Sequence, residues 1–392
     1  MRGRRLSLSS IRFVRSFNTV SILRTLYHEE SCTRARLTEL TKMSPATVTR
    51  IVSELIEQGL IVEECLGESN GGRRPVIFKL HYDKMFAAGL QILRDQVVIA
   101  IYDIKGRQVV KKAFQQYSMD PEALLAELAV EFEAFLRENQ IDREHILGIG
   151  LAISGIVDSE NGILIRSGNL GWRDVKVTET LEKSLGIQVF IENDANAAAL
   201  AEIWFGKAVD VNSMLYIKTA TGVGAGIIYQ RNLLTGVRGM AGEIGHIPLV
   251  RGGRPCRCGQ SGCLETYLYL PDVLRRYELE SGTRLRNGEE FFGQAAAGDS
   301  LARQLISEAA EALTASLSFA VLLLDLEMVV IGGLWGKFLD QFIGQINERF
   351  QDELDKGGLN KPVLVKSSVL GEDADLAGAA GLVINEWFTP PL

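Results

Sequence analysis

The spacing of apolar positions predicts three helices near the start of the chain. Apolar side chains recur at helical spacing in the segments Ile11–Glu30, Arg34–Thr41 and Pro45–Gln58, as they do on the buried face of a helix. Ser44, which precedes a proline, is typical of a helix N-cap. Gly59 is typical of a helix end. The third helix therefore has well-defined limits in the sequence.

The segments after the third helix predict a small β-hairpin. Leu60–Glu64 and Val76–Leu80 have the composition of strands, and the polar, glycine-rich segment Gly67–Arg74 joins them. Helices followed by such a two-stranded wing are typical of a winged helix-turn-helix. We therefore expect a winged helix-turn-helix domain over residues 1–82.

The exposed face of the third helix predicts contact with DNA. Its side chains are small, polar or basic, which lets the helix enter a major groove closely. Two arginines of the wing are long enough to reach a phosphate or a neighbouring minor groove. A three-helix bundle that binds another protein is the alternative interpretation. The expected DNA-contacting residues are Ser44, Ala46, Thr47, Thr49, Arg50, Arg73 and Arg74.

Charge is distributed unevenly along the chain. Residues 1–80 carry thirteen Lys and Arg and eight Glu, so 13 − 8 = +5; the whole chain has a net charge of −7, which leaves −7 − 5 = −12 for the remainder. A basic head on an acidic body indicates that only the head meets a polyanion, although a frayed basic tail would look the same. The longest uncharged stretch, Ala312–Leu324, is too short for a transmembrane helix. We therefore expect a cytoplasmic protein without membrane contact.

After the head, strands alternate with helices. Phe86–Ile92, Gln96–Asp103 and Arg107–Gln116 predict three consecutive strands, Pro121–Asn139 predicts a helix, and Ile146–Ile153 predicts a further strand. This first series ends with the strand Val189–Ile191 and the helix Ala195–Phe205. A second series consists of the strand Met214–Thr219, a glycine-rich turn over Thr221–Gly226, the strand Ile227–Gln230, the helix Leu301–Leu324 and the strand Met328–Ile331. The repetition predicts a duplicated α/β fold with two lobes.

Four potential metal ligands lie close together in the second series. His246 is followed by Cys256, Cys258 and Cys263, which supply one imidazole and three thiolates. That set completes the tetrahedral coordination of zinc and leaves no open position, so the predicted site is structural, with one Zn²⁺ per chain. Three buried free thiols are the alternative.

Several carboxylates and an amide lie near these ligands. Asn193 and Asp194 follow a predicted strand at the end where α/β folds bind ligands. Glu243 precedes His246 by three residues, and Glu265 follows the last cysteine by two. Carboxylate and amide oxygens accept hydrogen bonds from the hydroxyls of a polyhydroxylated ligand, and a carboxylate can also act as a general base. A solvated acidic surface explains any one of these residues equally well.

The body resembles the ROK family (repressors, open reading frames and kinases) over residues 83–392. The resemblance implies the family's duplicated actin-like, sugar-kinase fold, a ribonuclease H-like architecture of two lobes. The matching motifs are Ser154-Gly155-Ile156-Val157-Asp158, Gly168-Asn169-Leu170-Gly171-Trp172, Glu192-Asn193-Asp194-Ala195-Asn196, Gly242-Glu243-Ile244-Gly245-His246, the cysteine segment through Glu265, and Gly378-Ala379-Ala380.

The resemblance also implies a sugar pocket. In family members the Asn-Asp pair, the Glu and His of the Gly-Glu-x-Gly-His motif and the Glu after the last cysteine hold a sugar. Asp194 corresponds to the catalytic base of the family's kinases. The implied sugar-binding residues are therefore Asn169, Asn193, Asp194, Glu243, His246 and Glu265.

One departure from the family pattern indicates that the chain is not an enzyme. Family kinases carry Asp-x-Gly-Gly-Thr in the first hairpin, where this chain has Gln91-Ile92-Leu93-Arg94-Asp95. Side chains replace both glycines, so the backbone cannot approach a phosphate closely, and Asp95 adds a repelling charge. Catalysis is therefore expected to be lost while sugar binding is kept.

Together these features predict a repressor of carbohydrate metabolism genes that responds to a sugar or sugar derivative. We expect it to bind an inverted-repeat DNA operator as a homodimer or a larger even homo-oligomer. Two alternatives remain: a ROK-type sugar kinase with an accessory DNA-binding head, and a non-catalytic, zinc-stabilised protein that binds another protein.

Overall fold

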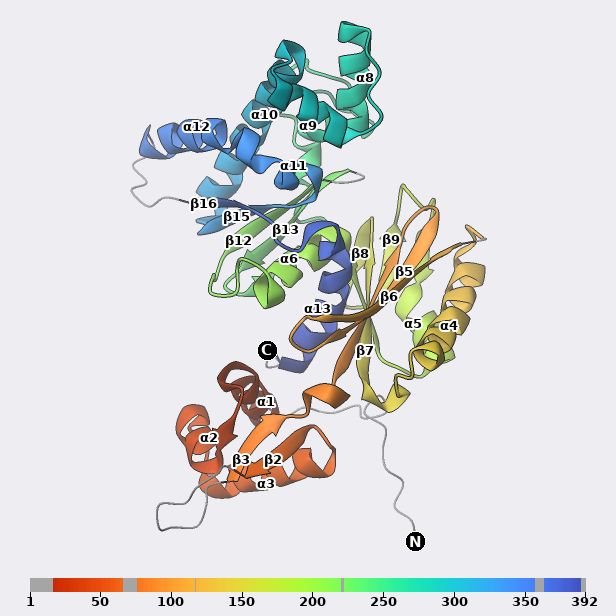
Figure 1. Cartoon of the computed structure of the whole chain (residues 1–392), viewed down its shortest axis with the longest axis vertical. Helices are drawn as coiled ribbons and strands as arrows, with labels where there is room; N and C mark the ends of the chain where they lie inside the picture. Colours follow the sequence, from red (N-terminus) through yellow and green to blue (C-terminus); the bar gives the residue numbers. More distant parts are fainter. Residues whose placement is uncertain (1–16, 66–75, 117, 220–221, 357–362, 389–392) are drawn as a thin grey trace. The chain divides into compact units, whose positions relative to one another are not determined.

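A computed structural model describes residues 17–65, 76–116, 118–219, 222–356 and 363–388. The chain forms two compact units, which are described one at a time (Figure 1). The first unit contains the described residues of Met1–Ile153, Ser159–Glu192 and Ala379–Leu392. The second contains those of Ser154–Asp158 and Asn193–Gly378.

The head is a winged helix-turn-helix within the first unit. Its small sheet has the strand order β1-β3-β2, so a short strand that the sequence did not predict adds a third member. The part of the first predicted helix before Phe17, and the wing loop, lie outside the described residues. The elements are α1 (Phe17–Glu29), β1 (Cys32–Thr33), α2 (Arg34–Thr41), α3 (Pro45–Glu57), β2 (Ile61–Cys65) and β3 (Val76–Leu80).

The limits predicted for α3 are confirmed. The Ser44 side chain accepts a hydrogen bond from the Thr47 backbone N–H at 3.2 Å, and proline occupies the first turn. Gly59 follows the helix with a φ of +73°, in the left-handed region that glycine adopts without strain. The inward face of α3 is fully buried at Val48, Ile51, Val52 and Leu55.

The rest of the first unit is built on a five-stranded sheet of order β11-β7-β4-β5-β6. β4 pairs with β7 in parallel and with β5 antiparallel, and β6 continues the antiparallel part. The hairpin of β9 and β10 and the helix α5 were not predicted. The elements are β4 (Phe86–Ile92), β5 (Gln96–Asp103), β6 (Gln108–Gln115), α4 (Pro121–Glu138), β7 (Ile146–Ile153), β9 (Ile163–Arg166), β10 (Arg173–Lys176), α5 (Val177–Leu185) and β11 (Val189–Asn193).

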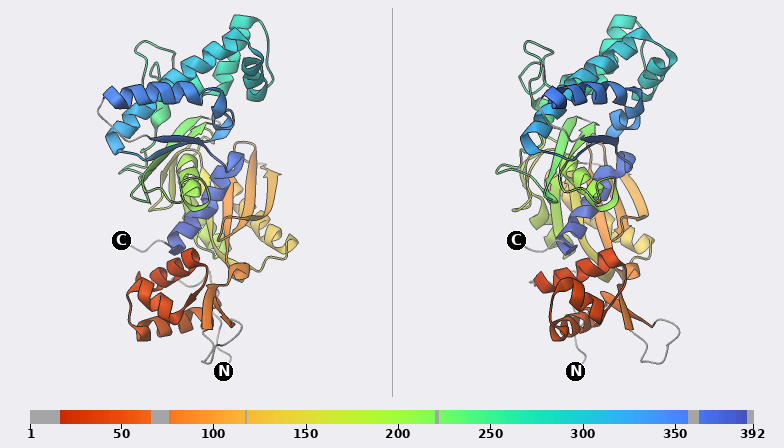
Figure 2. Two further views of the ribbon diagram at one scale, coloured as in Figure 1. Left: turned by 60° about the vertical axis from the view of Figure 1, so that its left-hand side comes forward. Right: turned by 90° about the vertical axis from the view of Figure 1, so that its left-hand side faces the viewer.

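The second unit has its own five-stranded sheet of order β14-β13-β12-β15-β16. Helices α7 to α12 share one hydrophobic core with β12, β13 and β15, and α6 packs on β12 and β13 (Figure 2). The elements are β8 (Ile156–Asp158), α6 (Asp194–Phe205), β12 (Met214–Thr219), β13 (Val223–Tyr229), β14 (Asn232–Leu233), α7 (Glu265–Leu268), α8 (Leu270–Ser281), α9 (Gly288–Ala297), α10 (Ser300–Leu324), β15 (Met328–Ile331), α11 (Gly333–Lys337), α12 (Ile343–Lys356) and β16 (Leu364–Ser367).

The two sheets share one topology. In each, the first strand (β4 or β12) forms a hairpin with the next strand, and a third strand follows at the edge. On its other side the first strand pairs in parallel with a later one, β7 or β15. The predicted duplication of an α/β fold is therefore confirmed.

The glycine-rich turn predicted over Thr221–Gly226 is wrong in its second half. β13 begins at Val223, so Gly224 and Gly226 lie within a strand. A Cβ atom at Gly226 would lie 2.5 Å from the carbonyl oxygen of Ala195. Gly226 is therefore required where α6 packs closely on β13, whereas a Cβ atom at Gly224 would lie in ordinary contact with Ala195, at 3.5 Å.

One helix, α13 (Ala374–Phe388), begins in the second unit and ends in the first. In the second unit, a Cβ atom on Gly378 would lie 2.0 Å from the carbonyl oxygen of Ala197 in α6. In the first unit, a Cβ atom on Gly150 of β7 would lie 1.7 Å from the carbonyl oxygen of Ala379. Two adjacent residues of α13 thus pack against the backbone of different units.

Among the described helices, α10 is long and apolar enough to cross a membrane by length and composition alone. Of its most apolar 18-residue window, 61% is buried within the protein. The place of α10 in the hydrophobic core of the second unit explains its apolar composition.

We predict that Gly378→Ala destabilises the folded protein by about 1–3 kcal/mol or more, because the added methyl group collides with a backbone oxygen of α6. Gly293→Ala in α9 is the matched control: nothing lies within 4 Å of the added Cβ atom, and alanine favours a helix over glycine by about 1 kcal/mol. Urea unfolding measures both variants. Equal midpoints for the two would contradict the close packing of α13.

Candidate functional site

The four predicted metal ligands lie together in the second unit. One ligand atom from each of His246, Cys256, Cys258 and Cys263 can be chosen so that all four lie within 4.8 Å of one another. The loop that carries the cysteines turns back on itself at Gly262, whose φ is +76° and whose Cβ position is occupied by the carbonyl oxygen of Val250 at 1.9 Å. Only glycine fits this turn.

The distances between ligand atoms fit a tetrahedral metal site. The Sγ atoms of Cys258 and Cys263 are 3.7 Å apart, and Cys256 Sγ is 3.7 Å from Nδ1 of His246. A tetrahedron with metal–sulfur distances of about 2.3 Å has edges of about 3.8 Å. The cluster therefore suggests a metal site, and its three thiolates and one imidazole are a donor set typical of zinc.

Glu243 connects the metal ligands to the neighbouring carboxylates. Its Oε2 atom lies 4.0 Å from Nε2 of His246. The other ring nitrogen of His246, Nδ1, is the one that lies near the sulfur of Cys256. Burial raises the pKa of Glu243, and the negative charges of Asp194 and Glu265 raise it further, against the opposing effect of His246. The three carboxylates therefore lie close enough to repel one another.

Glu265, the first residue of α7, is 4% exposed and bound on both oxygens. Arg257 approaches it in a bidentate manner, with Nε 2.8 Å from Oε1 and a terminal guanidinium nitrogen 3.0 Å from Oε2. The backbone N–H of Val223 also donates to Oε2, at 3.2 Å. Because Arg257 lies between two of the cysteines, the metal loop directly fixes the orientation of this carboxylate.

Asn193 and Asp194 lie where β11 runs into α6. The Asn193 Oδ1 atom caps α6 by accepting the backbone N–H groups of Ala195, at 2.9 Å, and Asn196, at 3.3 Å. Its Nδ2 atom donates to the carbonyl oxygen of Gly155 at 2.8 Å. The Oδ1 atom of Asp194 accepts from Ala195 N–H at 2.9 Å. The helix start therefore fixes both side chains.

A buried lysine that the sequence analysis did not single out holds the other oxygen of Asp194. Lys218 Nζ, near the end of β12, lies 2.6 Å from Asp194 Oδ2 and also contacts Oδ2 of Asp375 in the first turn of α13. The two carboxylates outweigh the effect of burial and raise the pKa of Lys218. A lysine that directly follows the apolar run Met214–Ile217 was the available signal, because a buried lysine requires a partner.

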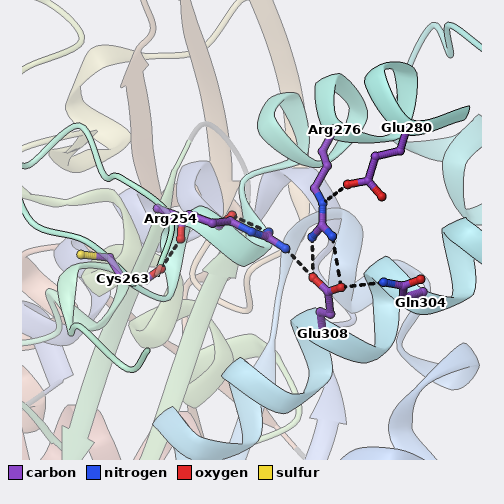
Figure 3. A network of polar contacts seen from close by, with 7 residues as sticks. Arg254, Cys263, Arg276, Glu280, Gln304 and Glu308 are labelled. Carbon is purple, nitrogen blue, oxygen red and sulfur yellow. Dashed lines mark hydrogen bonds and ion pairs between the residues drawn. The ribbon is translucent and has the colours of Figure 1, made fainter. Parts of the chain in front are cut away.

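The metal loop is also tied to the helices of the second unit. Figure 3 shows Arg254, which precedes the first cysteine by two residues, and Arg276 of α8 converging on Glu308 of α10. Arg254 also donates to the carbonyl oxygen of Thr266 at 3.0 Å and lies over the ring of Tyr267. Gln304 donates to the other oxygen of Glu308 at 3.1 Å. This network holds both ends of the loop.

The other predicted site residues lie in the first unit. In α3, Ser44, Ala46, Thr49 and Arg50 are exposed and Thr47 is half-buried, so this face is accessible. Arg50 forms an ion pair with Glu54 at 2.6 Å, and a DNA phosphate must compete with that carboxylate. The wing residues Arg73 and Arg74 lie outside the described residues. Asn169 lies in an exposed turn between β9 and β10.

The hairpin between β4 and β5 is closed by backbone hydrogen bonds. Leu93 N–H donates to the carbonyl oxygen of Gln96 at 2.9 Å, and the Gln116 side chain donates to the carbonyl oxygen of Arg94. Arg94 and Asp95 are exposed at its tip. Leu93, Arg94 and Asp95 all have negative φ values, so no residue of this tip adopts the left-handed conformation of a glycine turn.

Comparison with known proteins identifies the body. The model of the ROK family matches residues 87–386. The chain belongs to the ROK family. The model of the MarR family matches residues 17–63, which are the helices of the head and the start of its sheet. The chain is thus a ROK family transcriptional regulator with a MarR-like helix-turn-helix, and both the resemblance and the predicted fold class are confirmed.

Similar proteins include regulators and an enzyme. The xylose repressor of Caldicellulosiruptor bescii is 29% identical over 86% of this chain and 87% of its own length. The glucokinase of Halalkalibacterium halodurans is 30% identical over 75% of this chain and 94% of its own length. A solved ROK family transcriptional regulator, described as a homologue of the E. coli MLC protein, has a TM-score of 0.85 at 25% identity and covers 95% of this chain and 97% of its own.

Proposed function

We propose that this protein is a cytoplasmic repressor of carbohydrate metabolism genes whose binding to DNA is controlled by a sugar. The observation that carries the proposal is the union, in one chain, of a MarR-like head with a ROK body that gathers carboxylates beside a metal cluster. The similar glucokinase covers 75% of this chain, whereas the similar regulator structure covers 95%. The presence of the head therefore favours a transcriptional regulator over a sugar kinase.

In this proposal α3 is the recognition helix. Its accessible residues Ser44, Ala46, Thr47, Thr49 and Arg50 enter the major groove, and Arg73 and Arg74 of the wing reach the neighbouring backbone. One helix of this length reads only a few base pairs. The chain therefore acts as a homodimer or larger even assembly on an inverted repeat.

The sugar binds to the carboxylates and amides beside the metal cluster. Asn193, Asp194, Glu243, His246 and Glu265 of the second unit supply the contacts. The carboxylate and amide oxygens among them accept hydrogen bonds from sugar hydroxyls. Arg257 holds Glu265 in a fixed position, which keeps the entropy cost of binding low.

Two features argue against phosphoryl transfer and for binding alone. The β4–β5 hairpin carries Leu93, Arg94 and Asp95 where the family's kinases have a glycine-rich phosphate cradle, and exposed Asp95 would repel a nucleotide phosphate. Asp194, at the position of the kinases' base, already directs its Oδ2 atom at the buried ammonium of Lys218. Taking a proton from a sugar hydroxyl would remove the charge that holds this buried pair together.

Zinc fills the cluster of His246 and the three cysteines and acts structurally, one ion per chain. Four protein ligands leave no position for a substrate. A zinc ion held by these four residues would anchor the loop from which Arg257 holds Glu265, with Nε2 of His246 facing Glu243. Zinc thus shapes the sugar site without touching the sugar.

Helix α13 connects the sugar site to the head. In its first turn Asp375 contacts Lys218, which holds Asp194. At its other end, the ring of Phe388 packs against Tyr27 of α1, with centroids 4.9 Å apart. Glu30, just after α1, forms an ion pair at 2.5 Å with Lys105, in the turn after β5. A sugar that shifts Asp194 and its partners therefore acts on a helix that contacts the head directly.

Operator binding measured against sugar concentration tests this function. We predict that an effective sugar weakens binding of the protein to an inverted-repeat operator selected from random sequence, as followed by fluorescence anisotropy. Asp194→Asn should bind the operator normally but respond only at sugar concentrations about 10-fold to 100-fold higher, the loss expected for one charged hydrogen bond. Asp272→Asn, which alters an exposed carboxylate of α8, is the control. Coincident curves for wild type and Asp194→Asn would rule out this sugar site.

Metal analysis tests the zinc assignment. We predict one zinc per chain in the purified protein, a content well below one for Cys258→Ser, and weaker sugar binding in that variant because the loop that holds Glu265 loses its anchor. Cys32→Ser should keep its zinc, since Cys32 lies in β1 of the head and away from the cluster. A Cys258→Ser protein with undiminished zinc, or a wild-type protein with almost none, would contradict the assignment.

A further inference from the structure

The loop that carries the cysteines is open to solvent at its tip. Residues 257–261 are all exposed, and nothing lies within 4 Å of the Cβ position of Gly259. The chain becomes buried immediately after this tip, and Cys263 is 0% exposed. One end of the metal site therefore faces solvent, while the other end is covered by the second unit.

Cys258 differs from the other described cysteines in its access to solvent. Cys32 and Cys263 are buried and Cys256 is half-buried, whereas Cys258 is exposed. A cysteine that oxidants attack has to be both accessible and present as a thiolate. The proposed zinc site supplies the second condition, because a cysteine that ligates zinc does so as a thiolate.

A second sulfur lies next to that of Cys258. The Sγ atoms of Cys258 and Cys263 are 3.7 Å apart, and a disulfide requires a separation of about 2.05 Å. Gly259 and Gly262, which lie between the two cysteines, have φ values of +92° and +76° and turn the intervening chain back on itself. Only a small movement of the loop is therefore needed to join the two sulfurs.

We propose that Cys258 is an oxidative modification site, at which a peroxide converts the thiolates of Cys258 and Cys263 into a disulfide and so removes the metal. The inference rests on the zinc site of the proposed function. It adds a redox input to that site, so that the protein responds to an oxidant as well as to a sugar.

The peroxide is the oxidant in this reaction and is reduced to water. The Cys258 thiolate attacks one peroxide oxygen and the O–O bond breaks, which gives a sulfenic acid and a hydroxide that takes up a proton. The Cys263 thiolate then attacks the sulfenic sulfur; the S–S bond forms, the S–O bond breaks, and the departing hydroxide takes up a second proton. In total, two thiolates, one hydrogen peroxide and two protons give one disulfide and two water molecules.

The disulfide leaves His246 and Cys256 as the remaining ligands of the site. Two of the four ligands are too few for a structural zinc site. Loss of the metal frees the loop that positions Arg257, which binds both oxygens of Glu265 at 2.8 and 3.0 Å. Because Glu265 is among the proposed sugar contacts, the oxidised protein binds its sugar more weakly.

Zinc release from the full-length, metal-loaded protein tests the proposal. The metal content of the reduced protein is measured first. Hydrogen peroxide is then added in excess, a chromogenic chelator follows free zinc, and peptide mass spectrometry locates the disulfide. We expect the release of about one zinc per chain and a disulfide between Cys258 and Cys263, both of which dithiothreitol with added zinc should reverse.

The possible failures are distinguishable. Zinc that is retained in peroxide, or released while the thiols of Cys258 and Cys263 stay free of each other, overturns the inference and leaves the zinc assignment standing. Reduced protein that contains almost no zinc contradicts the zinc assignment, and the inference fails with it.

Two variants separate the exposed sulfur from the other cysteines. Cys258→His replaces this sulfur by a nitrogen ligand that zinc also accepts, so peroxide should release its zinc at least about tenfold more slowly. Cys32→Ser, which removes a buried cysteine of the head, should lose zinc at the wild-type rate. Equal release rates for the wild type and zinc-loaded Cys258→His overturn the proposal. If Cys258→His does not hold zinc, the position of the disulfide in the wild type decides.

Calorimetry tests the effect on the sugar site. The probe is a sugar that releases the reduced protein from its operator, and it should bind the oxidised protein about 10-fold more weakly, the loss expected for one charged hydrogen bond. Equal affinities of the reduced and the fully oxidised protein overturn the redox input. If no sugar releases the reduced protein, the proposed function fails, while zinc release still decides whether Cys258 is the modification site.

Discussion

The structure depends on the path of α13 through both units. Gly378 packs against the carbonyl oxygen of Ala197 in α6, and the carbonyl oxygen of Ala379 packs against Gly150 in β7. Neither glycine has space for an added side-chain atom. Packed interfaces of this kind do not deform continuously, so a shift of α6 or β7 must move the helix as a body or break the contact. In the proposed function, α13 is therefore the element that would carry a change at the sugar site to the head.

The buried cluster of Lys218, Asp194 and Asp375 explains how ligand binding can act on that helix. The three groups come from β12, α6 and α13, and burial makes each one dependent on the others. A sugar hydroxyl that donates to Asp194 competes with the ammonium for the same carboxylate. In the proposed function, the contact between Lys218 and Asp194 would thus both prevent Asp194 from serving as a base and give the sugar a means to act on α13.

Local signals in the sequence were sufficient for most of the fold. The strand Ile146–Ile153 and the helix Arg34–Thr41 have the predicted limits. The spacing of apolar residues along the chain determines these limits without reference to distant residues. The metal ligands could be predicted from spacing alone, since all four lie within eighteen residues of one another along the chain. Gly226 of β13 was misplaced in a turn because the reason for a glycine there, close contact with α6, lies in the tertiary structure. Lys218 and Asp375 were missed for the same reason: they are far apart in the chain, and neither has a motif.

Thermodynamic linkage between the two ligands tests the central claim, that sugar occupancy reaches the head through α13. The measurement is operator affinity with and without saturating sugar, and sugar affinity with and without operator, for the wild type and Tyr27→Ala. In the wild type the two ratios must be equal and well above one. Tyr27→Ala removes the ring that packs against Phe388, so we predict a folded protein that binds each ligand alone while both ratios fall toward one. A Tyr27→Ala protein with the full wild-type ratios would contradict the account.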